Sequence, residues 1–180
     1  MKKQLQLISL LVGLFISQQV YGQCGVERQK VKTLQDRTAS KIVFTPVVST
    51  VTQLASLPAP KPPKTTRLLS EEQVYSLDVM VLGYKHESDG DYHVVIASPT
   101  NTKLTMIAEI PDPKCAPAKY ADNFKSLRAF FGKGKTQMTW FAPPIHVRMD
   151  GVLFFDFIHG QTGVAHNGVE LHPVLKIVKE

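Results

Sequence analysis

The strongest constraint on the fold is a period-two alternation of apolar and polar side chains that begins at Val74. Such alternation is typical of strands that have one face on a core and the other toward solvent. Turn residues divide the region into five predicted strands, which run from residue 74 to the turn at 87–90 and then over 92–97, 104–110, 145–157 and 169–178. The second half of the chain is therefore predicted to be β-rich.

One helix is predicted between the third and fourth of these strands. Its signals are an N-cap, an apolar face at helical spacing and terminating glycines, namely Asp122, then Phe124, Leu127, Phe130 and Phe131, then Gly132 and Gly134. The order β-β-β-α-β-β over residues 71–180 is that of a five-stranded OB-fold-like Greek-key barrel. We expect an all-β domain with one helix, and a generic β-sandwich or another barrel is the alternative.

Residues 23–70 have a different composition and are predicted to form an extended N-terminal arm. Four prolines fall within residues 57–63, a density that suits stiff polyproline II and not the interior of a sheet. Residues 42–48 are suited to a short edge strand. We interpret the proline-rich part as a semi-rigid linker, with a ligand for a proline-binding partner as the alternative.

The first residues have the three parts of a cleavable signal peptide. These are a basic start, an apolar run and a cleavage region, at Lys2 and Lys3, residues 7–16 and residues 20–22. They predict a signal peptide of residues 1–22, cleavage before Gln23 and a secreted or periplasmic protein. The run is too short for a membrane span, so no transmembrane segment is expected in the mature chain. A lipoprotein anchored at Cys24 is the alternative, which Gln23 disfavours.

The two cysteines, Cys24 and Cys115, are predicted to form a disulfide. Exported proteins fold where thiols oxidise, and this spacing matches no zinc or redox pair. Two free or intermolecularly paired thiols are the alternative.

The formal charge of +6 falls to +4 once Lys2 and Lys3 leave with the signal peptide. The remaining basic residues are scattered and never reach a run of five like charges. The sequence therefore has no strong nucleic-acid signature, and the oligomeric state is left open.

Two polar loops punctuated by glycine, at residues 86–90 and 159–168, flank the proposed ligand face. In an OB-fold, ligands lie across the second and third strands, beside the first-to-second and fourth-to-fifth loops. We predict a ligand-binding face that contains Tyr92, His93, Glu109, His159, Gln161, Asn167 and Glu170.

A divalent metal ion is the cofactor that this region suggests. Asp91 and His93 share one face of a strand because side chains alternate, and a carboxylate at Glu109 within an apolar run needs a partner. The hypothetical ligands are Asp91, His93, Glu109, His159 and His172. Imidazole suits zinc or copper, and carboxylate suits calcium or magnesium. The alternative is a hydrogen-bonded network that braces the C-terminal loop, because no short metal-site signature is present.

Four short motifs stand out in the mature chain. They are CGVER at residues 24–28, MIAEIP at 106–111, HGQTG at 159–163 and NGVELHPV at 167–174. Together they resemble a family of exported bacterial proteins of uncharacterised activity, over nearly the whole mature chain. The resemblance implies export, one cysteine near the mature start, another after the third strand, and a shared C-terminal loop. The family has a tryptophan where this chain has Gln29.

The leading functional hypothesis is an exported, non-enzymatic module that binds an extracytoplasmic saccharide, oligonucleotide or small anion. The alternatives are a metal-dependent hydrolase or phosphodiesterase, and an envelope-associated interaction protein. No Gly-x-Ser-x-Gly elbow surrounds Ser88 or Ser98, so a serine nucleophile is disfavoured. The acidic turn at residues 89–91 has no arginine beside it to clamp a phosphate.

Overall fold

A computed structural model describes residues 24–180 of the chain. The predicted signal peptide of residues 1–22 and the cleavage before Gln23 lie outside the described residues. Within residues 24–180, no helix combines the length and apolar character that a membrane span requires.

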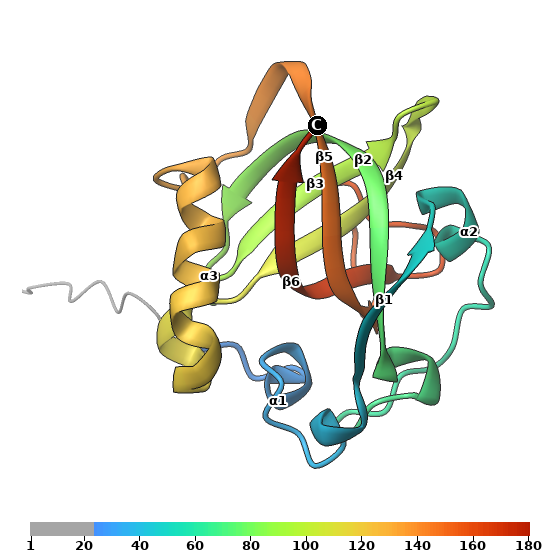
Figure 1. Cartoon of the computed structure of the whole chain (residues 1–180), viewed down its shortest axis with the longest axis vertical. Coiled ribbons are helices and arrows are strands. Elements are labelled where there is room, and N and C mark those ends of the chain that lie inside the picture. Colours follow the sequence, from blue (N-terminus) through green and yellow to red (C-terminus); the bar gives the residue numbers. More distant parts are fainter. Residues whose placement is uncertain (1–23) are drawn as a thin grey trace, which may run out of the picture.

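Strands make up most of the regular structure (Figure 1). The strands are β1 (Val43–Ser49), β2 (Gln73–His86), β3 (Tyr92–Ser98), β4 (Asn101–Ile110), β5 (Thr139–Phe155) and β6 (Val169–Lys179). The α-helices are α1 (Gln29–Lys32), α2 (Val51–Ala55) and α3 (Ala118–Phe131), and single 3-10 turns lie at Ala39–Lys41, Leu69–Glu72 and Pro113–Cys115. The predicted β-rich fold is confirmed, and α3 is the predicted helix. The sequence analysis did not predict the one-turn helices α1 and α2, because a segment of four or five residues is too short to show a helical period of apolar side chains.

The strands form one mixed sheet in the order β1-β2-β3-β4-β6-β5. Because β5 also pairs with β2, the pairings of β2 to β6 close into a ring. Pairing in the ring is antiparallel except between β4 and β6, which run parallel. The sheet has six strands because β1, which overlaps the edge strand expected at residues 42–48, joins the ring by parallel pairing with β2.

The inward side chains of the ring form the main core. They include Val79 on β2, Ile96 on β3 and Leu171 on β6, and α3 adds Phe124 from one side of the molecule (Figure 1). Side chains alternate along a strand, so the residues between these point to the outer face. Several of those outer residues are also buried, which means that other segments cover the ring from outside.

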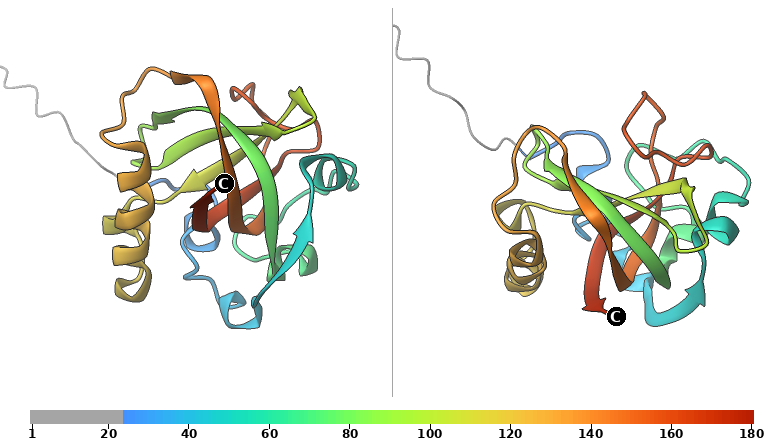
Figure 2. Two further views of the ribbon diagram at one scale, coloured as in Figure 1. Left: turned by 45° about the horizontal axis from the view of Figure 1, so that its top comes forward. Right: turned by 90° about the horizontal axis from the view of Figure 1, so that it is seen from above.

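Residues 24–70 supply part of this outer cover (Figure 2). Ile42 packs in a small apolar cluster with Val152, and Val51 joins the main core. The guanidinium of Arg28 lies in a buried, bidentate ion pair with Glu71, at 2.8 and 2.7 Å. The segment predicted to be an arm thus contributes both apolar and ionic contacts to the domain.

The predicted disulfide is confirmed. Cys24 and Cys115 are bonded, with their Cα atoms 5.7 Å apart. Their sequence separation of 91 residues means that the bond ties the start of the described chain to the 3-10 turn before α3.

Candidate functional site

A cluster of ionisable side chains lies on the outer face of β3, β4 and β6. Its members are Asp91, His93, Glu109, Glu170 and His172, all of them buried. Strand register brings them together, because His93 pairs with Glu109, and the parallel register of β4 and β6 places residue 172 beside residue 109. Alternation places Asp91 and His93 on one face of their strand, and Glu170 and His172 on one face of theirs, as expected. The pairing of neighbouring strands then brings the two pairs and Glu109 together.

Glu109 joins the two histidines. One of its carboxylate oxygens lies 3.2 Å from His93 Nδ1, and the other lies 3.2 Å from His172 Nδ1. On the far side of its ring, His172 Nε2 is 3.5 Å from Asp91 Oδ2. The result is a continuous row in the order His93, Glu109, His172, Asp91.

His93 has a defined proton on one ring nitrogen. Its Nε2 lies 2.8 Å from the carbonyl oxygen of Thr162, which can only accept, so Nε2 carries the proton. Burial lowers the pKa of His93, but the hydrogen bond to Glu109 and that carboxylate's charge outweigh burial and raise the pKa above its usual value. The imidazolium form is therefore favoured, because both ring nitrogens then donate.

Burial disfavours the charged forms of His172, Asp91 and Glu170. Burial lowers the pKa of His172 to about 4 and raises the pKa of Asp91 to about 6. Burial also raises the pKa of Glu170 well above its usual value. Within the part of the chain that the structure describes, Asp91 Oδ2, Glu170 Oε2 and both ring nitrogens of His172 make no hydrogen bond.

Lys32 reaches the cluster from α1, and no local sequence pattern predicted this contact. Its ammonium lies 3.3 Å from Asp156 Oδ2 and above the ring of Phe154. Burial acts to lower the pKa of Lys32, but the charges of Glu109, Asp156 and other cluster carboxylates raise it well above its usual value. The N-terminal segment thus supplies a cation to a site built mainly from the sheet.

A small cavity of about 190 Å³ opens onto the cluster. It is lined by Lys32, Glu87, Ser88, Asp89, His93, Glu109, Asp156, His159 and Gln161. His159 is exposed at the rim. The Gln161 side chain holds the loop, because it donates to the Phe157 carbonyl at 2.8 Å and accepts from the His159 amide at 2.9 Å.

Three of the predicted ligand residues do not line this cavity. Glu170 lies in the buried cluster, whereas Tyr92 and Asn167 make contacts elsewhere. Tyr92 points to the inner face of β3, where its hydroxyl donates to Gly132 O and accepts from Gly134 N. Asn167 ties the loop to the chain around α2 by donating to the carbonyls of Leu54 and Leu57, both at 3.0 Å. Their hydrogen bonds assign both side chains to structural contacts.

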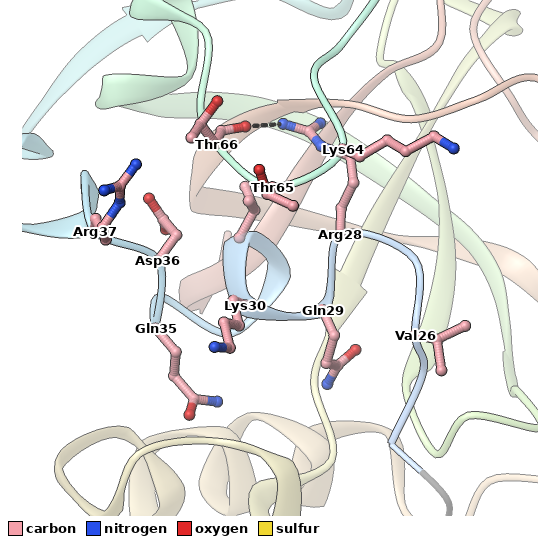
Figure 3. A pocket seen from close by; sticks show the side chains of 11 residues that line it. Val26, Arg28, Gln29, Lys30, Gln35, Asp36, Arg37, Lys64, Thr65 and Thr66 are labelled. Carbon is pink, nitrogen blue, oxygen red and sulfur yellow. Dashed lines mark hydrogen bonds between the residues drawn. The ribbon is translucent and has the colours of Figure 1, made fainter.

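A larger cavity of about 540 Å³ surrounds α1 (Figure 3). Two of its charged groups are engaged, since Arg28 donates to the Thr66 carbonyl and Asp36 pairs with Arg67. Figure 3 shows Lys64 and Arg37 extending to opposite sides of the view, so their charges do not converge on one point. The smaller cavity, where charged groups do converge, is therefore the better candidate site.

The loop of residues 156–168 covers the outer face of β3, and its contact with Val95 can be tested. At Gly163, with φ +84°, an added Cβ would lie 2.6 Å from Val95 Cγ1. Gly160 has a similar φ of +87° but no atom within 4 Å of an added Cβ. We expect Gly160→Ala to cost about 1–2 kcal/mol through the left-handed backbone, and Gly163→Ala about 2–4 kcal/mol because the clash adds to it.

Urea unfolding of both variants measures this difference directly. Equal losses of stability would contradict the close packing of the loop on β3, because only the Val95 contact distinguishes the two positions.

Comparisons of the chain with protein-family models, with curated proteins and with solved structures each gave no significant match.

Proposed function

We propose that this chain is an extracytoplasmic binding module with OB-fold topology, and that it takes a small cation in the acidic cavity beside β3 and β4. The observation that carries the proposal is the convergence of four carboxylates on that cavity, from Glu87, Asp89, Glu109 and Asp156. Lys32, whose ammonium lies against Asp156, is the one lysine in the lining.

The strand connections support the OB-fold assignment. Strands β2, β3 and β4 pair in succession, α3 follows β4, β5 pairs with β2, and β6 lies parallel to β4. In that fold, ligands bind on the face of the second and third strands, between the first-to-second and fourth-to-fifth loops. Here those strands are β3 and β4, and the corresponding loops supply Glu87 and His159 to the cavity wall.

The size and charge of the cavity favour a small cation over the larger ligands considered from the sequence. Its volume of about 190 Å³ matches the liquid volume of about six waters and is below the roughly 300 Å³ at which drug-sized sites begin. This space is too small to enclose a saccharide chain or an oligonucleotide. An anion would be repelled by the carboxylates of Glu87, Asp89 and Asp156 in the cavity wall.

Two features support an extracytoplasmic location. The Cys24–Cys115 disulfide is of the kind that persists in oxidising compartments. The sequence before Gln23 has the parts of a signal peptide.

Thermal unfolding of the disulfide-bonded protein tests the proposal. Chloride salts of divalent metals and of small amines, such as ethanolamine and spermidine, are added at equal ionic strength. A cation present at 100 times its Kd is expected to stabilise the fold by about 2.7 kcal/mol, which raises Tm by several degrees. Glu87→Gln should weaken the effect because it removes a charge from the cavity wall, whereas exposed Glu27→Gln should not. If no cation stabilises the protein more than sodium chloride does, the proposal is wrong.

A metal-dependent hydrolase is the second candidate, and one observation favours it. Glu109 belongs both to the buried cluster and to the cavity wall, so an ion held by it would be open to a substrate in the cavity. Metal-dependent cleavage of ester or phosphodiester substrates that Glu109→Gln abolishes would support this candidate.

A further inference from the structure

We infer that the cation is a divalent transition-metal ion bound by Asp91, Glu109 and His172, of which Glu109 lines the cavity and the other two are buried next to it in the cluster. This inference rests on the proposed function and names its ligand. One carboxylate oxygen from each acid and one ring nitrogen of His172 lie within 4.8 Å of one another, and all three residues are buried. Asp91 directly precedes β3, Glu109 lies in β4 and His172 lies in β6, so three separate segments of the chain converge.

The geometry is close to that of a metal centre. Zinc bonds of about 2.0–2.2 Å in a tetrahedral centre place neighbouring ligand atoms about 3.3–3.6 Å apart. The three ligand atoms lie within 4.8 Å of one another, so each pair needs to close by at most about 1.5 Å, which side-chain rotation can supply. The triad satisfies this without any change in strand pairing.

Unpartnered buried atoms provide independent support. Among residues 24–180, Asp91 Oδ2 and both ring nitrogens of His172 have no hydrogen-bond partner, although the two residues are only 1% and 0% exposed. Buried polar atoms are nearly always satisfied, and a missing ion is one recognised reason when they are not. Outside this cluster, the buried acids of residues 24–180 are Glu71 and Asp36, and each receives an arginine.

The charge balance leads to the same ligand. Asp91, Glu109 and Glu170 are buried together, while the nearby Lys32 lies against Asp156 and His93 lies against Glu109. Buried carboxylates need a cation or a proton, since an uncompensated buried charge is costly. A doubly charged ion would compensate two of them at once.

The donor set selects the class of ion. An imidazole with two carboxylates suits zinc or another first-row transition metal, whereas calcium and magnesium prefer oxygen ligands alone. Both cysteines are in the disulfide, so thiolate ligation is excluded.

Zinc binding by the chelator-treated, disulfide-bonded protein tests the inference. We expect isothermal titration with ZnCl₂ and elemental analysis to give one zinc per chain. Loss of an outer-sphere partner typically reduces metal affinity 10–100-fold, so removal of a ligand in Asp91→Asn or Glu109→Gln should reduce it at least about 100-fold. Asp78→Asn is the matched control, because Asp78 lies 2.6 Å from His146 in an exposed pair and its loss should leave the affinity unchanged.

Cobalt substitution keeps the test informative if the variants fail to fold. Co²⁺ added to the wild-type protein should give visible absorption bands that one equivalent of Zn²⁺ removes. The inference is overturned if the wild-type protein binds no zinc, or if Asp91→Asn and Glu109→Gln bind it as tightly as Asp78→Asn does. If zinc fails but an amine still stabilises the protein in a manner that Glu87→Gln weakens, the metal assignment falls while the proposed function stands.

Discussion

Glu71→Gln is expected to destabilise the protein by about 3–5 kcal/mol, the range for breaking one partner of a buried ion pair. The Glu71 carboxylate accepts four hydrogen bonds, two from Arg28 and one each from the amides of Leu68 and Phe155. A glutamine amide has one oxygen and cannot accept at its nitrogen, so at least one buried donor of Arg28 would lose its partner. Urea unfolding monitored by circular dichroism measures the change.

Glu72→Gln is the control for this prediction. Glu72 is the next residue in the same 3-10 turn but is only half-buried, and its substitution should change the free energy of unfolding by less than about 0.5 kcal/mol. A loss below 1 kcal/mol for Glu71→Gln would show that Arg28 finds another partner. The result also bears on the site, because the Arg28 guanidinium stacks 4.4 Å from Phe154, whose ring packs against His172.

Reduction of the Cys24–Cys115 bond is expected to lower stability by about 4 kcal/mol in the chain-entropy model, since it opens a loop of 91 residues in the unfolded chain. The effect acts mainly on the unfolded state. Buried Val31 and the Arg28–Glu71 pair should continue to hold the N-terminal segment in the native protein. We therefore expect a clear fall in Tm in strong reductant, with native circular dichroism retained before the transition.

A variant with both cysteines changed to serine controls for effects of the reductant itself and should melt like the reduced protein. An unchanged Tm after complete reduction, verified by thiol titration, would show that the closed loop is already restricted in the unfolded chain. The same samples report on the site, because Lys32 lies in the tethered segment and contacts Asp156.

The succession of strands and helix along the chain was predictable, because alternation is a local property of the sequence. The periodic run after Val74, the turn at 87–90 and the helix around Phe124 all appear in the structure near their expected positions. Strand β1 was predicted only as an isolated edge strand, since its parallel pairing with β2 depends on contacts that no local pattern encodes. The disulfide was predictable from the number of cysteines and the expected compartment.

Part of the candidate site was also predictable. Alternation placed Asp91 and His93 on one face of their strand and likewise placed Glu170 and His172 on one face of theirs, and the acid at Glu109 stood out within an apolar strand. Alternation also separates Tyr92 from His93, so Tyr92 was a poor choice for the same face. Asn167 was chosen for its polar loop, but its amide reaches the carbonyl of Leu54, more than a hundred residues earlier.

By itself, the sequence determined the strands after Val74, the helix α3, the pairing of the two cysteines and which residues of a strand share a face. Only the tertiary structure decided which face of β3 would point inward and that β4 and β6 would run side by side. It alone brought Lys32 to the acidic cavity. The physical reason is that period and turn chemistry act over a few residues, whereas the site depends on contacts between residues as distant as Lys32 and Asp156, which form only when the whole domain packs.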